Sequence, residues 1–332
     1  MRAPAFGVVG IGNAIVDVLA NVDDAFLAGH DLAKGAMTLI DEERAALLQE
    51  SVGESVECSG GSAANTMVGI ASLGGAAAYI GKVREDRLGE VFRESIRSAG
   101  VAFDTAPATD GPPTGRCVVL VTPDAQRTMQ TLLGSSATLA EEDVDQGTIA
   151  SSAITFLEGY LWDPPPAKQA FLRAAEIAHS RGRRVALSLS DRFCVDRHRG
   201  EFQELVEAHT DVLFANEDEA MALYESAGLD EALERLGASC QVAAITRGAS
   251  GSVIVADGKR TEVAAEPVER VVDTTGAGDL YAAGFLHGLS SGEDLAVCGR
   301  LGSIAAGEIV SHFGARPQCS LAELVRSRLQ RS

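Results

Sequence analysis

The chain has 332 residues, of which 46% are hydrophobic, so it is long enough and apolar enough to bury a sizeable core. Its 28 Lys and Arg residues against 47 Asp and Glu residues give a net charge of −19, which argues against nucleic acid as the main partner, because phosphate contacts need clustered basic side chains. Six scattered cysteines without a C-x-x-C pair, and six histidines without ligand spacing, argue against a disulfide framework and a zinc site and favour a reduced, cytoplasmic location.

The start of the chain does not read as a targeting segment. Within residues 1–24, glycines together with Asn13 and Asp17 interrupt the apolar stretches, so we expect neither a signal peptide nor a membrane span. The stretch "GIGNAI" (10–15) follows a predicted strand and resembles the start of a dinucleotide-binding loop. Ile15 stands where the third glycine would be, so the stretch gives only weak support to a dinucleotide-dependent oxidoreductase.

Two segments carry strand-like pieces outside the main rhythm of the chain. One covers about residues 16–45, and the other covers about 102–134 and contains two strands (115–134) joined by a Pro-Asp turn. These segments predict either a small β lid that closes over a site or an ordinary extension of the main sheet.

Strands and helices alternate through the rest of the chain. This alternation predicts one α/β domain over residues 1–332, with a mostly parallel sheet between two helix layers. We expect helices over 62–75, 86–101, 163–183, 217–224, 276–290 and 293–313, and strands over 77–83, 183–191, 211–216, 240–248 and 251–258.

The stretch "DTTGAGD" (273–279) stands at the start of a predicted helix. The first turn of a helix has amides without intrahelical partners and a positive dipole end, so Gly276, Ala277 and Gly278 could surround an anion. A carboxylate repels a phosphate, so Asp279 makes chemical sense there as a base that takes a proton from an attacking hydroxyl. The combination indicates phosphoryl transfer.

A simpler interpretation of the same stretch is a capped helix start. Thr274 or Thr275 would be the N-cap, and the negative charge of Asp279 would stabilise the first helical turn. The chain contains no G-x-x-x-x-G-K-[ST] sequence, so a P-loop enzyme is excluded.

Three motifs together resemble one family. "DTTGAGD" resembles the C-terminal signature of the ribokinase-like (pfkB) carbohydrate kinases, "SGGSAANT" (59–66) resembles their N-terminal glycine signature, and "NEDEA" (216–220) resembles their N-x-x-E motif. The order of the motifs and the α/β rhythm fit along nearly the whole chain. Within the family, "GNAIVDV", "FANEDEA" and "HFGARP" look most like adenosine kinases of bacteria.

The resemblance implies roles on the acceptor side. Asp279 matches the catalytic base, and Gly276, Ala277 and Gly278 match the anion hole. Asp17 matches a carboxylate that binds the sugar hydroxyls. The other residues that the resemblance places near the sugar are Asn13, Gly60, Gly61, Asn65 and Glu158. An ionised carboxylate can accept from both vicinal hydroxyls of a ribose, which agrees with the role of Asp17.

On the nucleotide side the resemblance implies ATP with Mg²⁺. Asn216 and Glu219 match the pair that organises Mg²⁺ through water, although an acidic first helical turn explains them equally well. Thr246 and Gly248 match the ATP-side turn, and Gly314 and Ala315 match the adenine pocket. Some relatives also bind K⁺ near the anion hole, and Asp273 and Thr275 are its candidates here. Arg127 could face the transferred phosphate from the lid.

We therefore expect an ATP-dependent kinase that phosphorylates a primary hydroxyl of a ribose-containing acceptor, with adenosine, giving AMP, as the leading substrate. A kinase of ribose, fructose or 2-keto-3-deoxygluconate, and a non-catalytic nucleoside- or sugar-binding protein, are the competing interpretations. The expected partner is a small molecule, with no nucleic acid and no membrane, and the protein would be a monomer or a homodimer. Phe103, Met37, Met129 and Leu133 are the candidates for lining a purine slot.

Overall fold

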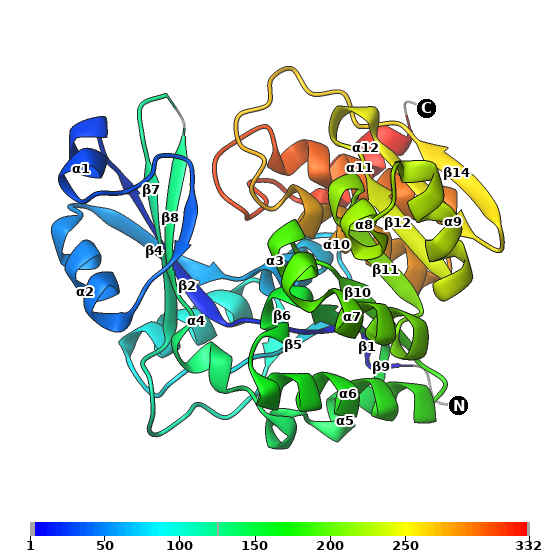
Figure 1. Cartoon of the computed structure of the whole chain (residues 1–332), viewed down its shortest axis with the longest axis horizontal. Helices are drawn as coiled ribbons and strands as arrows, with labels where there is room; N and C mark the ends of the chain where they lie inside the picture. Colours follow the sequence, from blue (N-terminus) through cyan, green and yellow to red (C-terminus); the bar gives the residue numbers. More distant parts are fainter. Residues whose placement is uncertain (1–3, 125, 331–332) are drawn as a thin grey trace.

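The computed structural model describes residues 4–124 and 126–330. It contains a large sheet between helices and a smaller sheet beside it (Figure 1). The main sheet has the strand order β14-β13-β12-β11-β10-β9-β1-β5-β6. Its strands are β1 (Phe6–Ile11), β5 (Ala77–Ile80), β6 (Val101–Phe103), β9 (Ser152–Glu158), β10 (Arg184–Ser188), β11 (Val212–Asn216), β12 (Val242–Thr246), β13 (Ser252–Ala256) and β14 (Lys259–Val263).

Seven of these strands pair in parallel, and β13 and β14 extend one edge through antiparallel pairings. Alternate residues of each strand enter two separate apolar clusters, for example Val9 and Leu213 on one face and Val8 and Val212 on the other. The predicted three-layer α/β/α core with a mostly parallel sheet is therefore confirmed.

Helices cover both faces of the main sheet. One face carries α5 (Gln146–Ala150), α6 (Pro165–Ser180), α7 (Arg192–His209), α8 (Glu217–Tyr224) and α9 (Leu229–Ser239). The other face carries α3 (Ser62–Ser72), α4 (Arg87–Ser98), α10 (Ala277–Ser291), α11 (Leu295–Ile309) and α12 (Leu321–Leu329). Across residues 4–124 and 126–330, every helix is too short or too polar to span a membrane.

The small sheet has the order β3-β8-β7-β2-β4. Its strands are β2 (Ile15–Asn21), β3 (Met37–Leu39), β4 (Ser55–Gly60), β7 (Gly115–Val121) and β8 (Arg127–Leu132). The predicted lid segments, about 16–45 and 102–134, contain four of these strands but omit β4. The second segment also begins inside β6, which belongs to the main sheet, because a three-residue apolar strand gives no sign of which sheet it joins.

The two faces of the small sheet differ in their cover. Ala20, Val118 and Leu120 pack against α1 (Asp24–Gly29) and α2 (Glu42–Ser51), which lie on the outer side of the sheet (Figure 1). Side chains alternate along a strand, so the odd-numbered residues of β2 and β7 project from the opposite face, toward the main body. The strand register aligns Asp17 with Cys58 and Cys117 on that face.

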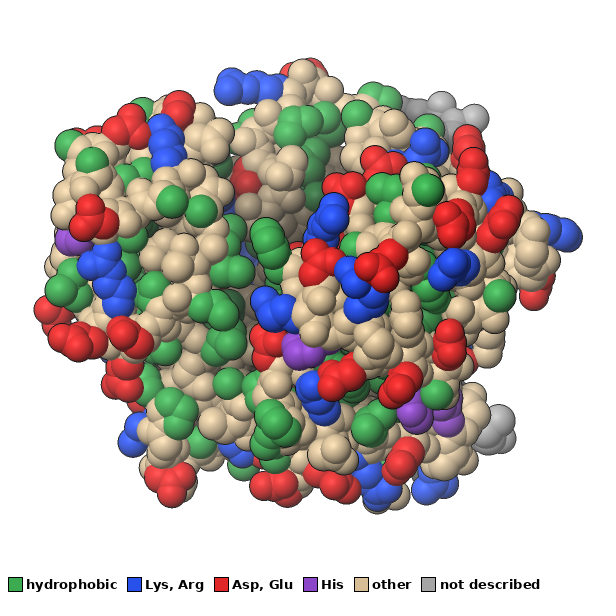
Figure 2. Space-filling model, in the orientation of Figure 1, with side chains coloured by type: hydrophobic (Ala, Val, Ile, Leu, Met, Phe, Trp, Pro, Cys, Tyr) green, Lys and Arg blue, Asp and Glu red, His purple; other side chains and the backbone are tan. Residues whose placement is uncertain are grey.

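Four apolar residues continue this inner face of the small sheet. Leu19 of β2 lies opposite Val119 of β7, Val119 lies opposite Met129 of β8, and Met129 lies opposite Met37 of β3. We call these four residues the apolar row. Figure 2 shows a hollow between the part that contains the small sheet and the main body. Met37 remains 46% exposed.

Candidate active site

The helix that follows "DTTGAGD" begins as predicted. Gly276 is the N-cap of α10 and has φ +77°, a left-handed conformation that glycine adopts without strain. The amide of Ala277 donates to Thr274 O over 3.1 Å. In the described part of the chain the amides of Gly278 and Asp279 have no hydrogen-bond partner, so these two donors, at the positive end of the helix dipole, are available to an anion.

Asp279 is held by two side chains from the first turn of α3. Ser62 Oγ donates to Asp279 Oδ1 over 2.6 Å, and Asn65 Nδ2 donates to Oδ2 over 2.9 Å. Burial raises the pKa of Asp279, while these two hydrogen bonds and the charge of Arg316 lower it. The carboxylate is therefore fixed in orientation beside the amides of the α10 N-terminus.

Asn65, which we expected near the sugar, also binds Asp279 directly. It is 5% exposed, and its amide nitrogen orients Asp279. Its Oδ1 atom is buried without a partner among the described residues. Because a buried acceptor without a donor costs free energy, this oxygen is available to a hydroxyl that enters beside Asp279.

Asp17 lies against the glycine turn. A Cβ on Gly60 would stand 2.3 Å from Asp17 Oδ1, and a Cβ on Gly61 would stand 2.1 Å from Asn13 O, so side chains are sterically excluded at both positions. Burial raises the pKa of Asp17 to about 6 and the charge of Asp279 adds to the effect, whereas Arg316 and Arg127 oppose it. The turn at 59–61 therefore brings Asp17 into the same electrostatic neighbourhood as Asp279.

Asn13 and Glu158 bind each other instead of facing an open cleft. Glu158 is 1% exposed and accepts from Asn13 Nδ2 over 2.9 Å and from the amide of Ala63 over 2.7 Å. Ser136 Oγ donates to Asn13 Oδ1 over 2.9 Å, so the Asn13 amide group is occupied at both ends. Burial raises the pKa of Glu158 to about 7. The geometry gives the pair a supporting role, because it joins β1, β9 and the start of α3.

Asn216 and Glu219 form the N-terminal cap of α8. Asn216 Nδ2 donates to Glu219 Oε1 over 2.6 Å, and the Glu219 amide donates to Asn216 Oδ1 over 2.8 Å. Burial, with a smaller contribution from the charges of Asp191 and Asp218, raises the pKa of Glu219 to about 7. No group of three potential metal-ligating side chains occurs among the described residues. One amide and one carboxylate, from Asn216 and Glu219, suit Mg²⁺ that is bound mainly by water and phosphate better than a metal ion held by protein ligands alone.

The remaining nucleotide-side candidates lie on two loops. Thr246 ends β12, next to Asn216 at the end of β11, and Gly248 follows with φ +53°. Gly314 has φ +98°, and a Cβ on Gly276 would stand 3.0 Å from Ala315 Cβ. Residues 314–315 therefore lie against the N-terminus of α10.

Asp273 and Arg127 connect the small sheet to the main body. Arg127 Nε lies 3.0 Å from Asp273 Oδ2, and both side chains are more than 90% buried. Asp273 also accepts from the amides of Thr275 (3.0 Å) and Gly314 (3.2 Å). Both oxygens of the predicted K⁺ candidate therefore have partners, and Arg127, expected to face a phosphate, pairs with Asp273 instead.

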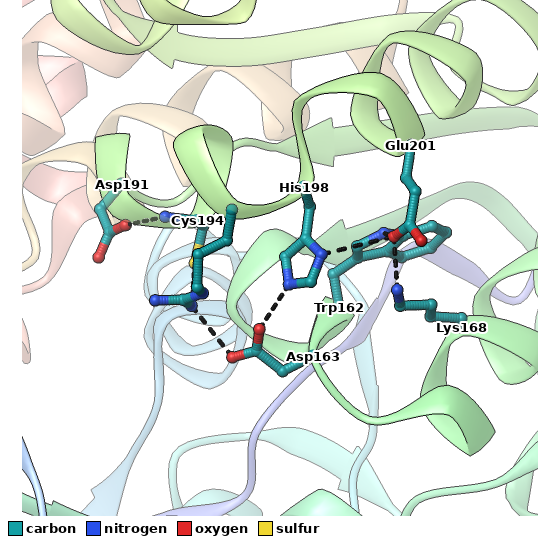
Figure 3. A network of polar contacts seen from close by, with 8 residues as sticks. Trp162, Asp163, Lys168, Asp191, Cys194, His198 and Glu201 are labelled. Carbon is teal, nitrogen blue, oxygen red and sulfur yellow. Dashed lines mark hydrogen bonds and ion pairs between the residues drawn. The ribbon is translucent and has the colours of Figure 1, made fainter.

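A second polar cluster, outside this site, supports the loop after Glu158 (Figure 3). Asp163 pairs with His198 and with Arg197, and Glu201 accepts from Trp162 Nε1 over 2.7 Å. These contacts tie the turn at Gly159–Trp162 to α7, which is kinked at His198. The cluster thus fixes the segment on which Tyr160 stands.

Sequence reasoning missed three residues near Asp279. Ser62 lies inside "SGGSAANT", so its place within this motif was the available signal. Burial raises the pKa of Tyr160, and the charges of Asp191, Asp279 and Glu219 raise it further. Arg316 follows the predicted adenine-pocket residues, but a lone arginine in a loop is usually a surface residue, so no pattern singled it out.

Known proteins resemble this chain in both sequence and fold. Residues 36–322 match the family model described as pfkB family carbohydrate kinase. The adenosine kinase structure from Sinorhizobium meliloti is 52% identical, covers 97% of this chain and 99% of its own, and superposes with a TM-score of 0.90. A probable sugar kinase from Rhizobium etli is 47% identical, with 98% and 99% coverage and a TM-score of 0.91. Adenosine kinase 1 of Arabidopsis thaliana is 25% identical, over 92% of this chain and 94% of its own.

Proposed function

The chain belongs to the pfkB family of carbohydrate kinases, and we propose that it transfers the γ-phosphoryl group of ATP to the primary hydroxyl of adenosine, giving AMP. The predicted resemblance to this family, and to its adenosine kinases, is thereby confirmed. The protein is a phosphotransferase with an alcohol group as acceptor.

The position of Asp279 carries this proposal. Its carboxylate stands between Ser62 and Asn65, and the amides of Gly278 and Asp279 lie beside it. A base that removes the hydroxyl proton and donors that stabilise the transferred phosphoryl group have to be adjacent for this reaction. Because Asp279 is already oriented by two hydrogen bonds, little reorganisation is needed when the hydroxyl enters.

Asp17 and the apolar row support a nucleoside as the acceptor. The ionised carboxylate of Asp17 can accept from the 2′- and 3′-hydroxyls of a ribose. The apolar row (Leu19, Met37, Val119 and Met129) lies on the same face of the small sheet and would cover a purine ring. Of the predicted slot residues, Met37 and Met129 lie in the row, but Phe103 is 1% exposed and packs against Phe92 in the core.

We place the nucleotide side on loops of the main body. We assign Thr246, Gly248, Gly314 and Ala315 to the ATP side, and Asn216 with Glu219 to Mg²⁺ through water. Bound Mg²⁺ would neutralise phosphate charge. A K⁺ ion at Asp273 and Thr275 would have to replace the Arg127 contact. We further propose that the chain forms a single kinase domain and that the small sheet acts as a lid over its active site. We also propose that the protein works in purine salvage in the cytoplasm, as a monomer or homodimer.

An ATP-consumption assay with Mg²⁺ tests the proposal against adenosine, inosine, guanosine, ribose, fructose and 2-keto-3-deoxygluconate. We expect turnover with adenosine far above that with the free sugars. Turnover with a sugar alone would keep the fold and Asp279 but reject the nucleoside acceptor. Thermal stabilisation by adenosine without turnover of any compound would reject the kinase and favour a binding protein.

A further inference from the structure

Arg316 donates hydrogen bonds to both ends of one short segment. Its Nε donates to Ser59 O over 3.0 Å, its Nη2 donates to Ser59 Oγ over 2.9 Å, and its Nη1 donates to Ala64 O over 3.1 Å. We call residues 59–64 the acceptor turn. The turn carries the glycine against Asp17, the hydroxyl that binds Asp279 and the amide that binds Glu158. A single side chain therefore fixes the segment on which these three carboxylates depend.

The loop that carries Arg316 also contacts the anion site. Immediately before Arg316, Ala315 lies against Gly276, and the amide of Gly314 donates to Asp273. Residues 314–316 thus bridge the N-terminus of α10 and the acceptor turn. A displacement of Arg316 would change the distance between the base and the hydroxyl that it has to deprotonate.

The charge of Arg316 has no direct counter-ion among the described residues, because its acceptors are two carbonyls and one hydroxyl. The titratable groups that face it are Asp17 of β2, Cys58 of β4, Tyr79 of β5 and Asp279 of α10. Burial raises the pKa of Cys58 to about 11 and that of Tyr79 well above its ordinary value, so both are neutral. Only two of the facing groups are anions near neutral pH.

Arg127 provides the contrast. It also faces Asp17, but Asp273 lies 3.0 Å from its Nε, so much of its charge is compensated. For Asp17, Arg316 is the strongest influence opposing the effect of burial. Burial alone would favour protonated aspartates, and a protonated Asp279 cannot act as a base.

Building on the proposed kinase function, we propose that Arg316 is a positioning residue for phosphoryl transfer: its guanidinium holds the acceptor turn against the anion site, and its uncompensated charge keeps Asp17 and Asp279 ionised at neutral pH. In the described part of the chain, Arg316 forms no hydrogen bond or ion pair with Asp17 or Asp279. It therefore acts through the carboxylates, and its removal should change the pH dependence of the reaction as well as its rate.

The test compares wild type with Arg316→Met, Arg316→Lys and Arg97→Met in kcat/KM for adenosine from pH 5 to 9. The acid limb is the part of the pH profile in which kcat/KM falls as the pH is lowered. For Arg316→Met we expect this limb to move to higher pH by about one unit. Arg316→Lys should keep the acid limb near that of wild type but raise the acceptor KM, because an ammonium group lacks the planar fork that reaches both Ser59 and Ala64. Arg97 makes a similar fork to Phe103 O at the edge strand β6, so Arg97→Met should leave the pH profile unchanged.

An acid limb of Arg316→Met that coincides with that of wild type overturns the proposal, whatever happens to the melting temperature. If Arg316→Met does not fold, Arg316→Gln is judged by the same criterion. A second readout requires no turnover: in protein labelled with ¹³C at the aspartate carboxyl, the signals assigned through Asp17→Asn and Asp279→Asn should titrate at higher pH in the Arg316 variant. A wild type inactive on every acceptor would reject the proposed function, whereas unmoved carboxyl titrations would reject the role of Arg316.

Discussion

The main sheet and the small sheet use their faces in different ways. The main sheet is buried by helices on both sides, and the polar residues Glu158, Asn216 and Thr246 stand at the carboxyl ends of three of its strands. Among the described residues, the small sheet has helices on one side only, and its other side presents Asp17 and the apolar row to the main body. The residues that we propose to take part in the chemistry thus belong to the main body, and the residues that we propose to select an acceptor belong to the small sheet.

This division has a physical basis. A base and an anion site need positions fixed within fractions of an ångström, which a sheet packed on both faces supplies. A surface that recognises a substrate has to be free until the substrate covers it, so one face must lack protein neighbours. Changes in the main body should therefore lower turnover, and changes in the small sheet should weaken acceptor selection.

Asp279→Asn changes the main body and should have the largest effect on activity of all the variants considered. Turnover is expected to fall on the order of 10²–10⁴-fold, because the amide cannot take the hydroxyl proton, while adenosine binding stays nearly unchanged. Steady-state kinetics and calorimetric titration with adenosine measure the two quantities. Asp294, also at a helix start, is exposed, so Asp294→Asn serves as a control with wild-type turnover. Undiminished turnover in Asp279→Asn would reject the base.

Asp17→Asn tests the small sheet. We expect the KM for adenosine to rise about 10- to 100-fold, because an amide accepts less strongly from two hydroxyls than a carboxylate does. The matched control is Glu57→Gln on β4, whose carboxylate pairs with the exposed Arg87 and whose loss should change little. A lowered kcat with an unchanged KM would place Asp17 in the chemical step instead.

Met129→Gln separates the role of the apolar row from that of Asp17, because it changes the row and leaves Asp17 in place. The preference for adenosine over ribose in kcat/KM should narrow about tenfold, since one apolar contact with a base contributes about 1–3 kcal/mol. Leu47→Gln on the outer helix α2, where the side chain is 46% exposed, should leave the preference unchanged. Equal losses for adenosine and ribose would show that Met129 supports the fold rather than the base.

The smallest expected effect concerns the stability of the main body. The pKa of Glu158 is raised to about 7 from an ordinary 4.5, so the folded state binds a proton that the unfolded state has already lost. Its contribution to stability is greatest below the ordinary pKa and is lost as the pH rises through about 7. From pH 8 to pH 6, wild type should gain about 1 kcal/mol in unfolding free energy relative to Glu158→Gln. Urea unfolding measures the difference, Glu142→Gln on the surface is the control, and equal pH dependence in all three proteins would contradict the prediction.

Much of the fold could be predicted from local patterns, and the exceptions have local causes. The helix at 62–72 and that at 277–291 follow glycine turns and consist mainly of small and apolar residues that are buried over long continuous runs. Helix α7 was not predicted, because the polar run at 196–201, which includes Gly200 and the kink at His198, separates Val195 from Phe202 and leaves few apolar residues to mark a helix.

The candidate site divides in the same way. Asp279 and the glycine turn lie within short motifs, so the sequence alone located them. The contacts that fix the site join distant segments: Asn13 and Glu158 are 145 positions apart, and Arg316 and Ser59 are 257 positions apart. Such pairs depend on how the two sheets pack, and no spacing in a single sequence records that packing.

The pairing of β2 with β7 affects how the acceptor side can be assembled. These strands run parallel, with Asp17 opposite Cys117, and the chain between them passes through β4 of the small sheet and through α3, β5, α4 and β6 of the main body. Closing a loop of this length is slow and carries an entropic cost before any contact repays it. Asp17 therefore cannot reach its neighbours from a local hairpin alone. An isolated N-terminal fragment that ends before β7 would lack the strand that pairs with β2 at Asp17, the carboxylate that we propose binds the sugar.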